Sequence, residues 1–216
     1  MNLFSTKKST SEDTTIITDN ENNFAPTKEK KEHPILEIIR FSLIALIIVI
    51  PIRMFIAQPF IVSGASMENT FHTGEYLIVD QLSYHFNQPS RGDVIVFRYP
   101  RDPSKFFIKR VIGLPGETIV IEGPTIHIKN KNNPEGFVLE EPYIKSMNNS
   151  TNMTEVLGDR EYFVMGDNRD QSSDSRAWGI LQQDRIIGHA FIRLFPPQKF
   201  KYLPGAITNT TVTSSS

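Results

Sequence analysis

The pattern of apolar and polar positions divides the chain into a polar beginning, one long apolar run and a series of short β-type segments. Residues 1–34 carry scattered charges of both signs and almost no apolar periodicity. This pattern is typical of a disordered tail, because too little surface can be buried to offset the entropy of ordering. The apolar run follows at 35–59. Its centre is uncharged, lies between Arg40 and Arg53, and reads FSLIALIIVIPI.

The length of this run predicts a transmembrane helix over 35–59. About 20 helical residues cross a bilayer core, so the run suffices if Arg40 and Arg53 extend their charged ends to the lipid head groups. Pro51 is expected to kink the helix near its outer end. A buried core helix would have to hide apolar surface on every face. A cleaved signal peptide would have a shorter polar segment before its apolar core. We therefore predict a membrane anchor.

The flanking cations predict how the anchor is oriented. Lys28, Lys30 and Lys31 precede the apolar run, whereas residues 59–78 contain neither lysine nor arginine. The positive-inside rule then places the N-terminal tail in the cytoplasm and the chain beyond the anchor outside it. The expected protein is a single-pass protein of the plasma (inner) membrane with an extracytoplasmic domain.

From residue 76 onwards the pattern is that of β-strands. The segments are short, rich in Val, Ile, Phe and Tyr, and separated by Gly, Pro or Asn turns. They read EYLIVDQL, DVIVFRYP, FFIKRVIGL, ETIVIE, TIHIK, EYFVMGD and IIGHAFIRLF. No helix-length apolar period lies between them, so a parallel α/β sheet is not expected. We predict a mainly β domain over 60–203 with a loop-like stretch at 134–158, followed by a flexible tail at 204–216.

Composition narrows the classes of function. The 216 residues fit one or two domains, and the net charge of −1 gives no overall field that would attract nucleic acid. The absence of cysteine excludes disulfides, thiolate nucleophiles and zinc–thiolate sites. The five histidines show no spacing typical of metal ligands. We expect no metal, no cofactor and no nucleic-acid partner.

The stretch Ser63-Gly64-Ala65-Ser66-Met67 follows the apolar run directly and offers a candidate nucleophile. A serine is weakly nucleophilic and needs a base within hydrogen-bond reach. No histidine lies in a recognisable triad context, but a lysine can act as the base if its pKa falls from about 10.4 to about 7–8. The fold must then disfavour the ammonium form by roughly 4 kcal/mol, at about 1.36 kcal/mol per pKa unit. Burial among apolar groups, away from carboxylates, can supply that penalty.

Lys109 meets these requirements locally. Strand alternation places it on the same face as Phe107 and Val111, with Arg110 on the opposite face. No acidic residue occurs between positions 105 and 114. The alternative is an ordinary strand lysine that points at solvent. We consider Lys109 the candidate base.

A polar loop over residues 166–176, GDNRDQSSDSR, offers supporting groups. Such a composition is also typical of a turn-rich surface loop with weak ion pairs. In the functional interpretation, Asp174 pairs with Arg176 or Arg169, which keeps its charge away from the lysine. Ser172 hydrogen-bonds the lysine amine and orients it without adding charge.

Three of these stretches, taken together, resemble the signature blocks of a known family. Ser66-Met67, the segment FIKRVIGLPGE at 107–117 and GDNRDQSSDSR at 166–176 are similar, in this order, to the blocks of bacterial type I signal peptidases. RGDVIVFRYP at 91–100 resembles a fourth block. The likeness covers about residues 37–196 except for a variable insertion at 124–158. Two long blocks in the right order are a specific signal.

The resemblance implies a role for each of these residues. Ser66 is the nucleophile, Lys109 is the general base and Ser172 orients the lysine. Asp174 and Arg176 form a buttressing ion pair, and Asp167 with Arg110 forms a second one. The resemblance also implies that a coiled antiparallel β-sheet carries the site.

It also implies an oxyanion hole and a substrate site. The backbone N–H of Ser66 is the expected oxyanion donor. Gly64 stands where some members carry a hydroxyl, which leaves Ser63 or a water as a further candidate donor. Asn69 stands where the family usually has proline, so the turn after the nucleophile is expected to be looser. Substrate pockets are expected to be lined by Val62, Ser63, Met67, Phe71, Phe107 and Ile108.

The resulting hypothesis is acyl transfer by a Ser–Lys dyad that removes signal peptides from translocated precursors at the membrane surface. The expected partners are signal-peptide-bearing precursors, the lipid bilayer and the secretion translocon. The alternatives are a non-catalytic, membrane-tethered binding or assembly module and a processing peptidase dedicated to one secreted partner. A self-cleaving Ser–Lys repressor would carry a DNA-binding domain before the catalytic part, whereas this chain has a polar tail and an apolar run.

Overall fold

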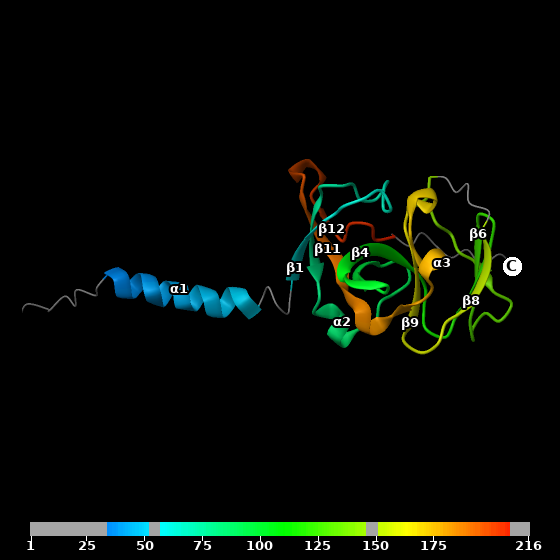
Figure 1. The fold of residues 1–216 in the computed structure, drawn as a ribbon, viewed down its shortest axis with the longest axis horizontal. Coiled ribbons are helices and arrows are strands. Elements are labelled where there is room, and N and C mark those ends of the chain that lie inside the picture. The colour runs from blue at the N-terminus through cyan, green and yellow to red at the C-terminus, as the bar shows by residue number, and fades with distance from the viewer. Residues whose placement is uncertain (1–33, 52–56, 146–150, 208–216) are drawn as a thin grey trace, which may run out of the picture. The chain divides into compact units, whose positions relative to one another are not determined.

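The computed structural model describes residues 34–51, 57–145 and 151–207. The predicted N-terminal tail, except its last residue, and the predicted C-terminal tail beyond residue 207 lie outside this range. The described chain contains an N-terminal helix and a β-rich unit (Figure 1).

Helix α1 spans Pro34–Pro51 and is apolar along its whole length. By length and composition it can cross a membrane, and none of its residues is buried against the rest of the described chain. Residues 57–59, at the end of the predicted range 35–59, belong to strand β1 (Ala57–Ile61) and not to the helix, while residues 52–56 lie outside the described part of the chain.

The β-rich unit contains strands β1 to β12 joined by short helices and turns. The strands are β1 Ala57–Ile61, β2 Tyr76–Asp80, β3 Val94–Tyr99, β4 Asp102–Gly113, β5 Thr118–Glu122, β6 Thr125–Lys129, β7 Phe137–Val138, β8 Asn152–Val156, β9 Glu161–Met165, β10 Leu181–Gln182, β11 Ile186–Phe195 and β12 Lys201–Tyr202. The helical turns are α2 Ser83–Phe86, η2 Arg169–Gln171, α3 Ser175–Trp178, η3 Gln183–Arg185 and η4 Pro197–Lys199.

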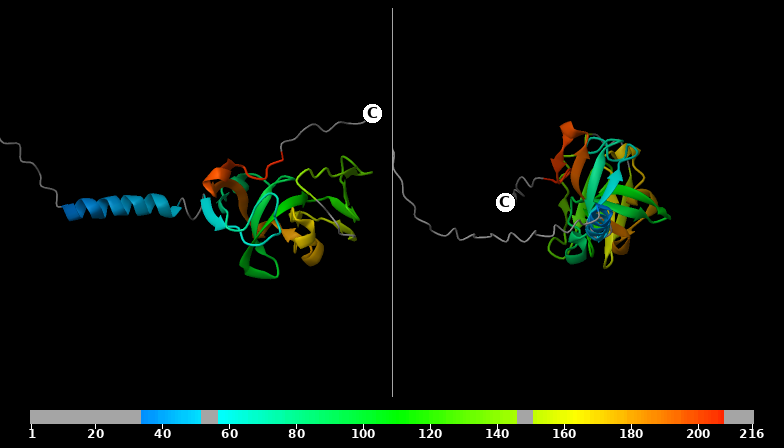
Figure 2. Two further views of the ribbon diagram at one scale, coloured as in Figure 1. Left: turned by 90° about the horizontal axis from the view of Figure 1, so that it is seen from above. Right: turned by 90° about the vertical axis from the view of Figure 1, so that its left-hand side faces the viewer.

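All strand pairs are antiparallel and form two sheets. The larger sheet has the order β1-β2-β11-β3-β4-β9-β10, with β12 paired to β11. The smaller sheet has the order β7-β6-β5-β8 and, in both Figure 1 and Figure 2, lies at the end of the unit away from β1 and β12. The prediction of a mainly β chain with antiparallel sheets and one apolar N-terminal helix is confirmed.

The long strand β4 is the element that positions the site. Asp102 and residues 106–110 pair with β3 on one side, with a register shift between them, whereas among the described residues β9 joins the other side only from Arg110 onwards. The sheet coils so that β1, which is distant in strand order, approaches this unpaired edge. The rings of Phe60 in β1 and Phe106 in β4 meet edge to face with their centroids 5.3 Å apart. Two strand edges therefore face each other across a gap that side chains line.

The smaller sheet includes a strand that the sequence analysis assigned to a loop. Strand β8 lies within the predicted loop-like stretch at 134–158 and pairs with β5 along its whole length. Its sequence, NMTEV, is too polar to signal a strand locally, and its pairing partner is what defines it. The apolar face of this sheet packs on the main sheet in a core of Ile112, Ile119, Ile121, Ile126, Ile128, Leu157, Phe163 and Met165.

Candidate active site

Ser66 lies in a turn between β1 and β2 that is closed by its own backbone. Glu68 N donates to Ala65 O at 3.0 Å, and Phe71 N donates to Met67 O at 2.8 Å. Gly64 has a φ of +97°, a conformation that disfavours any side chain at this position. The backbone N–H of Ser66 donates no hydrogen bond within the described part of the chain. A donor beside the hydroxyl is thus available to a ligand.

Asn69 was expected to loosen the turn, because the family usually has proline at this position, but its backbone conformation does not support that expectation. Its φ is +85°, in the left-handed region that asparagine tolerates and that a proline ring, fixed near −65°, cannot adopt. Thr70 N donates to Met67 O at 3.0 Å across this residue. The turn therefore uses a backbone shape in which proline has no place, and it is held by hydrogen bonds.

Lys109 in β4 reaches Ser66. The side-chain amine Nζ lies 2.8 Å from Ser66 Oγ and donates to Ile108 O at 2.9 Å. Phe107 lies on the same strand face, with its ring centroid 5.1 Å from Nζ. Lys109 is only 4% exposed. The alternative of a solvent-facing strand lysine is wrong for this structure.

Burial lowers the pKa of Lys109 from 10.5 to about 8. The negative charges of Asp174 and Asp167 act in the opposite direction and raise it. No carboxylate within the described ranges accepts a hydrogen bond from Nζ or forms an ion pair with it. The desolvation penalty therefore exceeds the Coulomb attraction, and about a tenth of the amine is neutral at pH 7.

The loop after β9 lies directly against Ser66. A Cβ atom on Gly166 would lie 2.4 Å from Ser66 O and 2.3 Å from Ser172 Oγ, so only glycine fits there. Asn168 N donates to Ser66 O at 3.0 Å, and its side-chain Nδ2 donates to Ala65 O at 3.0 Å. Neither Gly166 nor Asn168 was predicted from the sequence to have a role in the site. Both flank Asp167 in the block at 166–176, and this position is the feature of the sequence that could have indicated such a role.

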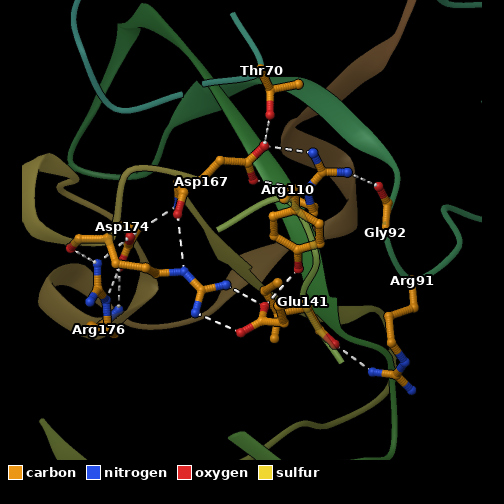
Figure 3. Close-up of polar contacts among 12 residues, drawn as sticks. Thr70, Arg91, Gly92, Arg110, Glu141, Asp167, Asp174 and Arg176 are labelled. Carbon is orange, nitrogen blue, oxygen red and sulfur yellow. Dashed lines mark hydrogen bonds and ion pairs between the residues drawn. The ribbon is translucent and has the colours of Figure 1, made fainter. Parts of the chain in front are cut away.

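Asp174 pairs with Arg176 and not with Arg169 (Figure 3). Arg176 Nε donates to Asp174 Oδ1 at 2.8 Å, and the backbone N–H of Gly166 donates to Asp174 Oδ2 at 3.1 Å. Arg169 instead forms an ion pair with Glu141, a residue that the sequence analysis did not single out. The Asp174 carboxylate is thus occupied by the loop itself.

Asp167 and Arg110 form the other ion pair (Figure 3). Arg110 donates to both carboxylate oxygens, from Nε at 2.8 Å and from Nη2 at 2.6 Å. Thr70 Oγ1 donates to Asp167 Oδ2 at 2.5 Å, which connects this pair to the turn at residues 65–71 that carries Ser66. Arg110 projects away from Lys109, as strand alternation predicted.

Ser172 does not make the contact that the sequence analysis assigned to it. Its Oγ atom is buried and has no hydrogen-bond partner among the described residues, so it does not bond Lys109 in this structure. It lies instead against Gly166, which separates it from the Ser66 carbonyl. A buried hydroxyl without a partner is costly.

A groove of about 510 Å³ runs past the Ser66–Lys109 pair. Four of the predicted substrate residues line it, namely Val62, Ser63, Phe107 and Ile108. Met67 and Phe71 do not, because both side chains turn inward and are buried in the core beneath, at 1% and 0% exposure. The remaining lining comes from Phe60, Ile61, Gly64, Ala65, Ser66, Leu77, Val96, Lys105, Phe106, Lys109, Gln171 and Ser173.

Comparison with known proteins gives consistent matches over most of the chain. The family described as "Signal peptidase, peptidase S26" matches residues 35–195. The probable signal peptidase I-1 of Synechocystis sp. is 38% identical over 177 residues, which cover 78% of this chain and 87% of that protein. Signal peptidase IB of Staphylococcus aureus is 31% identical over 80% of this chain and 95% of its own length. A crystal structure of a signal peptidase I from Enterococcus faecalis is 32% identical and covers 48% of this chain and 97% of that chain, with a TM-score of 0.41.

Proposed function

This chain belongs to the signal peptidase family, peptidase S26, and on that premise we propose that Ser66 and Lys109 are the dyad with which it cleaves signal peptides. The chain is a peptidase that acts on signal-peptide-bearing proteins. The observation that carries the assignment is the 2.8 Å separation of Lys109 Nζ and Ser66 Oγ, with the amine buried and not bonded to a carboxylate. The non-catalytic alternative gives no reason to bury a lysine against a serine hydroxyl.

In the first half of the reaction, neutral Lys109 takes the proton of Ser66 as Oγ attacks the scissile carbonyl carbon. A C–O bond forms, and the carbonyl oxygen becomes an oxyanion that the Ser66 N–H is placed to stabilise. The lysine then returns its proton to the leaving amine, the C–N bond breaks and an acyl-enzyme remains. With a pKa of about 8, about a tenth of Lys109 is neutral at pH 7.

In the second half, water replaces the leaving amine beside Lys109. The lysine removes a proton from this water as the water oxygen attacks the ester carbonyl carbon. It then protonates Ser66 Oγ as the ester C–O bond breaks, which regenerates the hydroxyl and releases a carboxylic acid that loses its proton to solvent. One group therefore acts alternately as base and acid, for which a pKa near the working pH is best suited.

Ser63 is the further candidate for oxyanion stabilisation. It lines the groove, and Gly64 next to it carries no side-chain donor. Removing one donor from an oxyanion hole costs about 2.7–4 kcal/mol in other enzymes. A second donor next to the Ser66 N–H would therefore contribute substantially to the rate.

The substrate is proposed to bind as an extended strand in the groove. Among the residues that the structure describes, β1 pairs only with β2, and β4 before Arg110 pairs only with β3, so both present backbone groups to a peptide lying between them. This is the β-augmentation mode, in which main-chain hydrogen bonds give affinity and alternate side chains enter pockets. Val62 and Ile108 line these pockets, which suits the small residues that precede a signal-peptide cleavage site.

The apolar helix α1 anchors the protein in a membrane. We place the lysine-containing segment before it in the cytoplasm and the β-rich unit outside, at the plasma membrane, from the distribution of lysines in the sequence. The bilayer is then a direct partner, and the secretion translocon is the machinery that would deliver precursors to this surface.

The test uses the full chain in detergent and a precursor carrying a signal peptide, with the cut site determined by mass. Ser66→Ala and Lys109→Ala are each expected to lower the rate by at least about 10³-fold while the fluorescence of Trp178 reports an intact fold. Lys129→Ala, which removes an exposed lysine from the smaller sheet, is the matched control. Wild-type rates in either dyad variant would disprove the assignment.

A further inference from the structure

A cluster of buried charged groups lies beside the dyad and takes no part in the steps above. Glu141, between β7 and β8, accepts hydrogen bonds on both carboxylate oxygens from Arg169, with Nη1 at 2.7 Å and Nη2 closer (Figure 3). Tyr143 donates its hydroxyl to the same carboxylate at 2.6 Å. The Arg169 and Glu141 side chains are 0% and 7% exposed. A bidentate pair this deeply buried is a strong and directional contact.

One chain of contacts connects the cluster to Ser66 through Arg169. Its Nε donates to Gly166 O at 3.1 Å. Gly166 in turn has no spare room against the Ser66 carbonyl oxygen, and Asn168 N donates to that same oxygen. A shift of the Arg169 guanidinium would therefore be passed to the backbone of Ser66.

A second chain of contacts connects the cluster to the turn at residues 65–71 through Tyr143. Its ring lies on the guanidinium of Arg110 at 3.9 Å from the ring centroid. Arg110 holds both oxygens of Asp167, which accepts the hydroxyl of Thr70. Burial and the Glu141 carboxylate raise the pKa of Tyr143, so the phenol stays a hydrogen-bond donor at working pH.

We propose that Glu141 and Tyr143 are positioning residues for the Ser66–Lys109 pair. This inference rests on the proposed function, and it gives the segment around residue 141 a role in catalysis. Glu141 binds the guanidinium of Arg169, and the ring of Tyr143 packs on the guanidinium of Arg110. These two arginines in turn bind Gly166 O and Asp167, in the loop that contacts Ser66. Removing the Glu141 charge leaves the buried Arg169 guanidinium without its counter-charge. This costs more free energy than the loss of a neutral hydrogen bond.

The experiment compares Glu141→Gln and Tyr143→Phe with Glu140→Gln, which removes the same charge one position away on an exposed side chain. Each full-length variant is assayed in detergent on a signal-peptide substrate. Glu141→Gln should lower kcat by roughly 10- to 100-fold, since misplacement by about 1 Å can cost that much. KM should stay within about twofold, because neither residue lines the groove and ground-state binding is untouched. Tyr143→Phe, which keeps the ring on Arg110, should lower kcat by a smaller factor.

A second readout does not depend on cleavage. Acetic anhydride labels neutral amines, and mass spectrometry gives the labelling of Lys109 relative to exposed Lys129. The ratio should rise severalfold in Glu141→Gln and stay at the wild-type value in Glu140→Gln. If Glu141→Gln does not fold, Tyr143→Phe carries both measurements. If the wild-type chain cleaves nothing, the proposed function fails. The labelling ratio alone then decides whether Glu141 and Tyr143 position Lys109.

Four results would overturn the proposal. The first is a kcat for Glu141→Gln equal to that of Glu140→Gln in a folded protein. The second is a loss of kcat that matches the loss of folded protein, which would make the role purely structural. The third is a raised KM with unchanged kcat, which would place the effect on substrate binding. An unchanged labelling ratio in a folded Glu141→Gln counts equally against it.

Discussion

Replacing Lys109 with methionine is predicted to make the folded protein more stable while abolishing cleavage. Methionine fills a similar volume and carries no charge that burial can penalise. In the wild type the pKa of Lys109 falls from 10.5 to about 8 on folding. At 1.36 kcal/mol per pKa unit, this difference corresponds to about 3 kcal/mol of stability that the buried ammonium removes at pH 7. The lost hydrogen bonds to Ser66 and Ile108 reduce the net gain to about 1–3 kcal/mol.

The gain should depend on pH with a definite sign. Below pH 8 Lys109 is protonated in both the folded and the unfolded chain, so the full penalty is present. Between about pH 8 and 10.5 the unfolded chain binds more protons than the folded chain, and wild-type stability rises with pH. The advantage of Lys109→Met over the wild type is therefore largest below pH 8 and disappears towards pH 10.5.

Trp178 is the single tryptophan and packs against Phe97 in the main sheet, with ring centroids 5.9 Å apart, so its fluorescence reports unfolding of this unit. Urea unfolding of the full chain in detergent, from pH 6.5 to 10.5, gives the free-energy difference between variant and wild type. The exposed Lys129→Met serves as the control and should change little at any pH. A Lys109→Met difference that is absent, or that does not decline with rising pH, would refute the desolvation argument.

Three further predictions follow from the site. The kcat/KM of the wild type should rise about tenfold per pH unit below pH 8 and level off above it, because neutral Lys109 is the active form; a flat profile from pH 6 to 9 would contradict this. Gly166→Ala should nearly abolish cleavage and lower the unfolding temperature, since its Cβ would lie 2.4 Å from Ser66 O and 2.3 Å from Ser172 Oγ; wild-type kinetics would contradict the packing. Asn69→Pro should cost more than about 1 kcal/mol in urea unfolding, whereas Asn69→Gly should be tolerated, because φ is +85° there; equal stability of the two variants would count against this backbone shape.

The main outline of the fold could be predicted from the sequence because strands follow a local pattern, whereas the proposed roles of Ser66 and Lys109 came from the resemblance to a known family. Alternating apolar residues define the strands, and the same alternation places Lys109 with Phe107 on one face and Arg110 on the other. The Asp174–Arg176 and Asp167–Arg110 pairs are also present in the structure, and their members lie within blocks that resemble a known family. The groove lining was predicted in part, with Val62 and Ile108 among its residues.

What could not be predicted depends on contacts between distant segments. Glu141 lies in a stretch with no strand pattern and becomes important only because the fold brings it to Arg169. Met67 follows Ser66 directly, yet the turn directs its side chain into the core and away from the groove. Strand β8 forms because its backbone pairs with the free edge of β5. In each case the decisive partner lies outside the local window from which a pattern is read.

The pKa of Lys109 illustrates why such contacts decide the chemistry. Asp174 and Asp167 both lie close enough to raise it, and two unpaired carboxylates would keep the amine charged. Each carboxylate, however, is bound to its own arginine, so Lys109 faces two compensated pairs whose fields fall off faster with distance than that of a single charge. The burial penalty then prevails. The ion pairs Asp174–Arg176, within the loop, and Asp167–Arg110, between the loop and β4, thus each carry no net charge, which favours loss of the Lys109 proton beside these two carboxylates.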